Sequence, residues 1–144
     1  MKIMVTGGAG FIGSAVCRQL VADDANHVVN VDKLTYAGNL ESLRAIENRP
    51  NYDFVEADIA DEDAMNEVLA TQEIEAVMHL AAESHVDRSI DGPDVFVETN
   101  VVGTCRLLSA ARRHFESLSG EASDRFRFHH VSTDEVYGDL PFES

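Results

Sequence analysis

Short apolar runs alternate along the chain with segments in which apolar residues recur every three or four positions. The runs favour buried strands, whereas the three-to-four spacing is typical of helices that pack on a core. The pattern predicts five strands, at 2–6, 27–31, 52–57, 75–81 and 127–132. It predicts helices at 11–22, 40–46, 61–70 and 94–118, with a polar break at 120–124.

Strands that alternate with helices predict an α/β fold with a doubly wound, parallel sheet of the Rossmann type and right-handed crossovers. The chain has 144 residues, 44% of them apolar, which suffices for one domain with a buried core. The longest predicted helix carries an apolar stripe that we expect to lie mostly in this core. Its members are Val97, Val101, Cys105, Leu108, Ala111, Phe115 and Leu118.

The charge balance limits the possible partners. The chain has 26 acidic and 11 basic side chains and a formal net charge of −15, which repels nucleic acid and anionic lipid. No apolar stretch approaches the roughly 20 residues that span a bilayer, and no leader segment precedes the first strand. We therefore expect a cytoplasmic protein with no nucleic-acid or membrane partner. Cys17 and Cys105 lie far apart in apolar, helical segments, which predicts free, buried thiols and no metal site.

A glycine-rich turn, GGAGFIG at residues 7–13, joins the first strand to the first helix. Its glycines fit the spacing G-x-G-x-x-G from Gly8 and G-x-x-G-x-x-G from Gly7. Glycine permits an unusual turn and lets a pyrophosphate approach the main chain, where the helix N-terminus supplies N–H donors. Asp32 ends the second strand 19 residues after Gly13, where a carboxylate can accept from ribose hydroxyls. The sequence predicts a dinucleotide site that favours NAD over NADP, because Asp32 would repel a 2′-phosphate.

Six motifs spread along the chain carry a family resemblance: GGAGFIG (7–13), VDKLTYAGNLESL (31–43), ADI (57–59), LAAESHVDRSI (80–90), TNVVGT (99–104) and STDEVYGD (132–139). With them the chain resembles the extended short-chain dehydrogenase/reductases and, within these, the dTDP-glucose 4,6-dehydratases. Nucleotide-sugar epimerases share the glycine turn but usually carry a serine-rich stretch in place of the last motif's Thr-Asp-Glu. UDP-glucose 4,6-dehydratases share the acid pair and are the nearest alternative.

The resemblance implies which residues would hold NAD. The glycine turn would bind the pyrophosphate, the segment after the second strand would surround the adenosine ribose, and Asp58 and Ile59 would contact the adenine. The implied contacts are Gly7, Gly10, Phe11, Ile12, Gly13, Asp32, Lys33, Leu34, Thr35, Asp58, Ile59, Leu80, Ala81, Ala82, Glu83, Ser84 and Thr99. As alternatives, Asp58 or Asp61 could simply cap the next helix, and 80–84 could be an ordinary tight turn. Asn100 would hold the geometry of the site from the long helix.

The acid pair after the fifth strand has a chemical interpretation within this resemblance. The family converts dTDP-glucose to dTDP-4-keto-6-deoxyglucose; oxidation at C4 makes the C5 proton acidic, so that water can leave across C5 and C6. The resemblance implies that Asp134 is the acid for the C6 hydroxyl, Glu135 the base for C5, and Thr133 a hydrogen-bonding partner of the sugar near C4, with Ser84 a further sugar contact. Neighbouring strand residues point to opposite faces, so both acids can serve one sugar only if the strand ends before them. A surface turn or helix cap is the alternative.

The oxidising residues that the resemblance implies are missing. The family deprotonates the C4 hydroxyl with a Tyr-x-x-x-Lys pair, but this chain has only Lys2 and Lys33, and Tyr137 is followed four residues on by Pro141. We therefore expect 1–144 to be the N-terminal part of an NAD-binding Rossmann domain, truncated before the later strands and the substrate domain, and inactive alone. The full-length protein would be a homodimer packed through the long helix. A non-catalytic dinucleotide-binding module is the second hypothesis.

Overall fold

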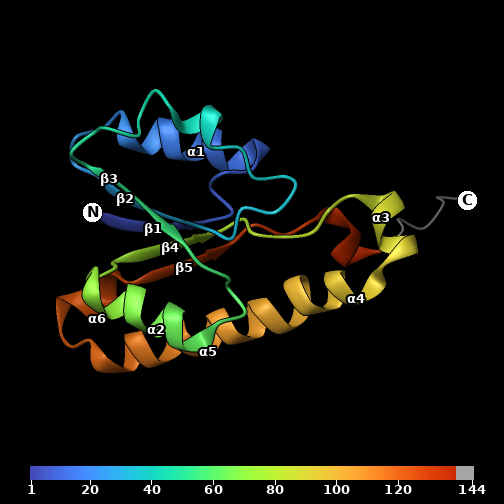
Figure 1. Ribbon diagram of the computed structural model, residues 1–144. Helices are drawn as coiled ribbons and strands as arrows, with labels where there is room; N and C mark the ends of the chain where they lie inside the picture. The colour runs from blue at the N-terminus through green and yellow to red at the C-terminus, as the bar shows by residue number, and fades with distance from the viewer. Residues whose placement is uncertain (139–144) are drawn as a thin grey trace, which may run out of the picture.

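The computed structural model describes residues 1–138, without the side chains of Val86, Asp134 and Glu135. Five parallel strands form one sheet between two layers of helices (Figure 1). The strands are β1 (Lys2–Thr6), β2 (His27–Asp32), β3 (Tyr52–Glu56), β4 (Ala76–His79) and β5 (Arg127–His130), in the order β3-β2-β1-β4-β5. All five predicted strands and the parallel, doubly wound architecture are confirmed.

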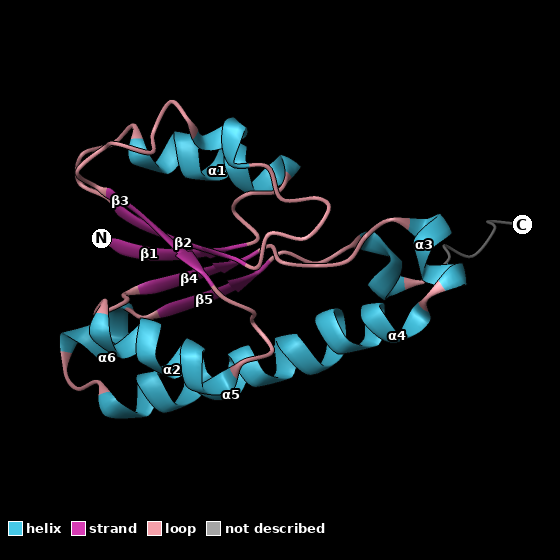
Figure 2. Cartoon of the chain, in the orientation of Figure 1, coloured by secondary structure: helices cyan, strands magenta, loops and turns pink. Residues whose placement is uncertain are grey.

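The helices cover both faces of the sheet (Figure 2). One face carries α1 (Phe11–Val21) and the short 3₁₀ helix η1 (Leu40–Leu43), and the other carries α2 (Glu62–Thr71), α5 (Thr104–Ser117) and α6 (Glu121–Arg125). The predicted helix at 94–118 is continuous but composite, built from α4 (Pro93–Phe96), the π-helix η2 (Val97–Gly103) and α5. The sequence missed α3 (Val86–Asp91), and the predicted polar break at 120–124 is wrong because α6 occupies it. No helix in the described part is long and apolar enough to cross a membrane.

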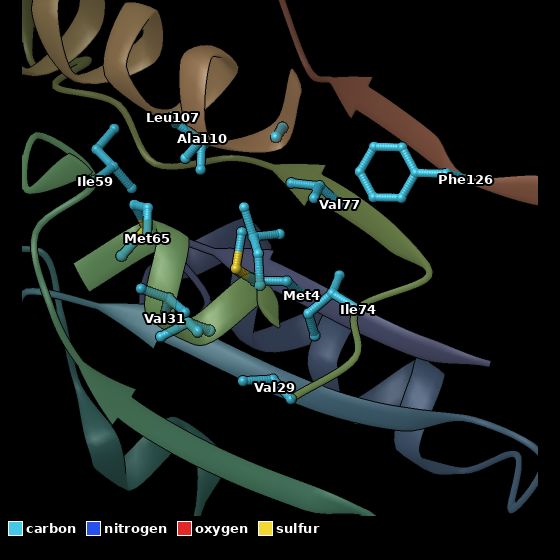
Figure 3. Packing of buried hydrophobic residues seen from close by; sticks show 13 residues of the cluster. Met4, Val29, Val31, Ile59, Met65, Ile74, Val77, Leu107, Ala110 and Phe126 are labelled. Carbon is cyan, nitrogen blue, oxygen red and sulfur yellow. The ribbon is translucent and has the colours of Figure 1, made fainter. Parts of the chain in front are cut away.

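Helices on both sides explain why the strands read as continuous apolar runs. Along β1, Ile3 and Val5 belong to the cluster on the α1 side, whereas Met4 belongs to the cluster on the α2 and α5 side. Met4 and Val5 have no exposed surface. Figure 3 shows the second cluster, in which side chains of the sheet meet Leu107 and Ala110 of α5. Burial on both faces is what a parallel sheet with crossover helices requires.

The apolar stripe predicted for the long helix is mostly not in the core. Val97, Val101, Leu108 and Phe115 are 54%, 61%, 46% and 45% exposed, and Cys105 is exposed as well. The buried face lies about one residue away around the helix and consists of Thr99, Gly103, Leu107, Ala110 and Ala111. Gly103, Leu107 and Ala110 also recur every three or four positions, so the helical period holds and the prediction chose the wrong face of the helix. Of the two cysteines, only Cys17 is a buried thiol.

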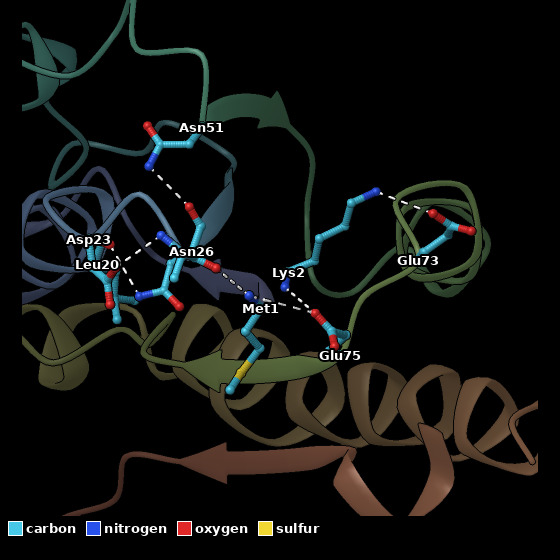
Figure 4. Close-up of polar contacts among 9 residues, drawn as sticks. Met1, Lys2, Leu20, Asp23, Asn26, Asn51, Glu73 and Glu75 are labelled. Carbon is cyan, nitrogen blue, oxygen red and sulfur yellow. Dashed lines mark hydrogen bonds and ion pairs between the residues drawn. The ribbon is translucent and has the colours of Figure 1, made fainter. Parts of the chain in front are cut away.

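Polar contacts secure the amino-terminal end of β1 (Figure 4). The Lys2 main-chain N–H donates to Glu75 Oε2 at 2.6 Å, and its ammonium lies 3.4 Å from Glu73 Oε2. On the other side of the strand, Asn51 Nδ2 donates to the Asn26 carbonyl at 3.0 Å. The bonds to Glu73 and Glu75 hold the start of β1 to the segment that leads into β4, and the Asn51 bond joins the segments that lead into β2 and β3.

Candidate functional site

A cleft of about 290 Å³ opens at the carboxyl ends of the strands. The strand order reverses between β1 and β4, which is where open α/β sheets bind their ligands. All the predicted cofactor contacts line this cleft except Leu34 and Asp58. The lining residues that sequence analysis missed are Val31, Ala37, Gly38, Ala57 and Val131. Ala57 and Val131 directly follow a strand and Val31 is the last residue but one of β2, so their positions relative to the strand ends were the available clue.

The glycine turn lies against the loop that follows β4. Gly7 has a φ of +71°, and a Cβ added there would lie 2.7 Å from the backbone of Ala81. A Cβ on Gly13 would lie 2.1 Å from the Gly7 carbonyl oxygen, so α1 can pack this closely only without a side chain. Gly8 instead faces Asn30 on the far side of the turn and does not line the cleft. The spacing that begins at Gly7 is therefore the one that shapes the site.

The N-terminus of α1 fits an anionic group. Gly10 is the N-cap residue, and it supplies no side-chain hydrogen bond to the first turn. The first N–H groups of a helix lack intrahelical partners and carry partial positive charge, which favours phosphate. Phe11 and Ile12 begin the helix and line the cleft, with Phe11 93% exposed. The turn thus offers main-chain donors to a pyrophosphate, and the contact itself stays a prediction.

Asp32 connects the glycine turn to the loop after β2. Its Oδ2 accepts from the Ala9 N–H at 2.9 Å, and its Oδ1 accepts from the Leu34 N–H at 2.8 Å. A carboxylate offers about four lone-pair positions, so acceptor capacity is left for hydroxyls in the cleft. The Leu34 side chain packs on the core cluster of the α1 side and does not line the cleft, so its contact with the cofactor stays a prediction.

Asp58 is the second predicted contact that lies outside the lining. Its Oδ2 pairs with Lys33 Nζ at 3.2 Å, and its Oδ1 accepts from the N–H two residues further on at 2.9 Å. Lys33 Nζ also donates to Thr99 Oγ1 at 3.3 Å. The helix-cap alternative holds for Asp61, whose Oδ1 accepts from a first-turn N–H of α2 at 3.0 Å. The Asp58 carboxylate therefore forms an ion pair with Lys33 at the rim of the cleft.

A buried histidine supports the loop after β4. His79 Nδ1 lies 2.7 Å from Thr6 Oγ1, and His79 Nε2 lies 3.0 Å from Thr104 Oγ1. Burial lowers the pKa of His79 to about 4, with a smaller lowering from His130. The ring is therefore neutral near pH 7, and it links the end of β1 to α5. Thr6 Oγ1 also accepts from the Ala81 N–H at 3.3 Å, which ties the cleft loop to this network.

Asn100 fixes the same loop from the long helix. The Glu83 N–H donates to Asn100 Oδ1 at 2.8 Å, and Asn100 Nδ2 donates to the Glu83 carbonyl at 2.8 Å. Two bonds between one amide side chain and one residue's main chain leave little freedom to the stretch that lines the cleft. Asn100 therefore holds the loop from the long helix, and the role in the site that the resemblance implies for it stays a prediction.

The fifth strand ends before the acid pair, which is what both acids need in order to serve one sugar. β5 ends at His130, and the backbone of Asp134–Tyr137 forms a short 3₁₀ helix, η3. Successive residues of a 3₁₀ helix lie about 120° apart, whereas strand neighbours point to opposite faces. Val131 and Ser84 line the cleft, while Thr133 is exposed and outside the lining. Asp139, the last residue of the motif, lies outside the described residues, as does Pro141.

A cleft of this kind on a parallel, doubly wound sheet is typical of dinucleotide-binding proteins. Comparison with known sequences identifies the family. The model of the GDP-mannose 4,6 dehydratase family matches residues 4–143, so the chain belongs to this family. It is 62% identical to dTDP-glucose 4,6-dehydratase of Shigella flexneri over 141 residues, which are 98% of this chain and 39% of that protein. With the same coverage it is 60% identical to dTDP-glucose 4,6-dehydratase 1 of Escherichia coli K12.

A solved structure gives the same picture. The dTDP-glucose 4,6-dehydratase of Streptomyces venezuelae, crystallised with NAD and TYD bound, superposes with a TM-score of 0.84 at 45% identity. The match covers 100% of this chain and 43% of that one. The resemblance inferred from the motifs is confirmed, and the chain spans about two-fifths of the length of the relatives it matches.

Proposed function

We propose that this chain is the N-terminal, NAD-binding part of a 4,6-dehydratase that acts on dTDP-glucose. The observation that carries the proposal is the cleft at the switch point of the sheet, lined by the turn at Gly7 and Gly13, by Asp32 and by the loop after β4. Relatives of 60% identity and more with the dTDP-glucose dehydratase name favour this substrate over UDP-glucose.

Each part of the cleft suits one part of NAD. The N–H groups at Phe11 and Ile12 would hold the pyrophosphate, and Asp32 would accept from the adenosine ribose. Gly7 lies close to the backbone of Ala81, which holds the loop after β4 against the glycine turn. The small residues of this loop, Ala81, Ala82 and Ser84, line the cleft and would contact the nicotinamide ribose. When bound, NAD supplies the chemistry of taking a hydride and returning it.

The acid pair would carry out the elimination. Glu135 would take the C5 proton and Asp134 would give a proton to the departing C6 hydroxyl, while Thr133 would hydrogen-bond the sugar near C4. The end of β5 before η3 supports this assignment, because it frees both residues from the alternation of a strand. The Tyr-x-x-x-Lys pair is absent from the 144 residues, so we propose that the chain alone is inactive.

A chimera tests the proposed function. This chain would be joined to the remaining portion of the Escherichia coli K12 relative, with which it shares 60% identity over 141 residues. We expect NMR to show conversion of dTDP-glucose to the 4-keto-6-deoxy sugar, with slower conversion of UDP-glucose. A chimera that binds NAD but converts neither sugar would favour the hypothesis of a non-catalytic module.

We also propose that the longer protein is a homodimer that acts in the cytoplasm without nucleic-acid or membrane partners. The exposed stripe of Val97, Val101, Leu108 and Phe115 supports the dimer, since adjacent apolar side chains on one helix face favour contact with another protein surface. We expect light scattering to give a dimer for the chimera and no stable dimer for the 144-residue chain. A tight dimer of the chain alone, or a monomeric chimera, would contradict this arrangement.

A further inference from the structure

A side-chain bridge crosses the rim of the cleft. The Tyr36 hydroxyl, in the loop after β2, donates to Glu83 Oε2, in the loop after β4, at 3.1 Å. Because β1 lies between β2 and β4 in the sheet, the bridge spans the loops on either side of the glycine turn. Thr35 and Ala37 line the cleft on both sides of Tyr36, whereas Tyr36 itself is 51% exposed and does not. The bridge therefore lies at the outer edge of the cleft.

Both ends of this bridge are held in place. Glu83 is only 8% exposed, and its main chain is fixed by the two bonds to Asn100. The Arg88 guanidinium lies over the Tyr36 ring, 3.7 Å from the ring centre, which is a favourable cation–π distance. Desolvation and the Glu83 carboxylate raise the pKa of Tyr36, so its hydroxyl stays protonated and donates. Both members of the bridge are therefore held by contacts of their own.

We propose that Tyr36 and Glu83 form a latch that must open for a dinucleotide to enter or leave the cleft. The inference rests on the proposed NAD site. With the adenosine at Asp32 and the nicotinamide beside the loop after β4, the pyrophosphate lies on the glycine turn, between the two bridged loops. A latch that closes equally well over the empty and the filled cleft slows association and dissociation alike. It leaves the equilibrium affinity nearly unchanged.

Stopped-flow fluorescence with NADH on the 144-residue chain tests the latch. Tyr36→Phe removes the hydroxyl and keeps the ring under Arg88. Because the bond joins a partly exposed pair with one charged member, we expect both rate constants to rise roughly tenfold, and Kd to change less than about twofold. Arg88→Gln, which removes the cation above the ring, should raise both rates by a smaller factor. Tyr137→Phe is the matched control, since this tyrosine is 90% exposed, and its rates should equal those of the unchanged chain.

The possible outcomes separate the latch from the site beneath it. Unchanged rates in Tyr36→Phe, with NADH still bound, would overturn the latch and leave the NAD site standing. Faster dissociation with unchanged association would make Tyr36 an ordinary cofactor contact and would also overturn the latch. If the unchanged chain, folded by circular dichroism, binds no NADH, the proposed function fails and the latch fails with it.

Discussion

Glu135→Gln and Asp134→Asn should each slow the loss of water from dTDP-glucose by roughly a hundredfold to ten-thousandfold, the range of lost general acid–base catalysis. Both substitutions are nearly isosteric, and they remove the ability to exchange a proton together with the negative charge of the ionised carboxylate. The measurement is single-turnover product formation in the chimera. NAD affinity should stay unchanged, because in the proposed site the turn at Gly7 and Gly13 and the Asp32 carboxylate would hold the cofactor.

The two variants should differ in kind as well as in rate. Loss of the base, Glu135, should suppress exchange of the C5 proton with solvent deuterium. Loss of the acid, Asp134, should permit exchange while water leaves slowly, because the base still removes the C5 proton. A dTDP-glucose analogue with fluoride at C6 needs less acid assistance, so it should partly rescue Asp134→Asn and not Glu135→Gln.

These experiments can contradict the assignment of roles directly. Equal rescue of both variants by the fluoride analogue would mean that the two residues do not have separate duties. Normal turnover in either variant would remove that residue from the chemistry. Because both variants keep the cofactor site, a simultaneous loss of NAD affinity would instead indicate a structural role for the η3 segment.

Much of the fold follows from the sequence because burial on both faces makes the strands easy to recognise. Ile3, Met4 and Val5 form an unbroken apolar run, and the structure buries them on alternate faces. The phase of the long helix was not predictable in the same way. Val101 and Leu107 are both apolar and belong to two rows with helical spacing, and only the row with Leu107 packs on the sheet.

In the candidate site, too, local features could be predicted from the sequence and contacts between distant segments could not. The places of the glycine turn and of Asp32 in the cleft were predictable because they depend on local backbone geometry and on the end of a strand. Contacts between loops were not, since Lys33 with Asp58 and Tyr36 with Glu83 lie far apart in sequence. Side-chain pairs of this kind depend on how neighbouring strands place their loops, and no local pattern encodes that placement.

The preference between NAD and NADP depends on two side chains. Asp32 is held by two N–H donors with its remaining oxygen positions free, so its charge lies where a 2′-phosphate would have to fit. Lys33 is paired with Asp58 and bonded to Thr99, so the Asp58 carboxylate offsets its charge and only one of its three N–H donors is left for that phosphate. Bringing like charges together costs several kcal/mol, and each ~1.4 kcal/mol is a tenfold change in affinity. Asp32→Asn removes the charge and should bring the two affinities within about tenfold of each other.

Calorimetric titration of the 144-residue chain with NAD and with NADP tests the central claim most directly, because it needs no other part of the enzyme. We predict one NAD bound per chain, with an affinity roughly a hundredfold higher than that for NADP. A folded chain that binds NADP as tightly as NAD, or that binds neither, would contradict the assignment of this cleft as an NAD site.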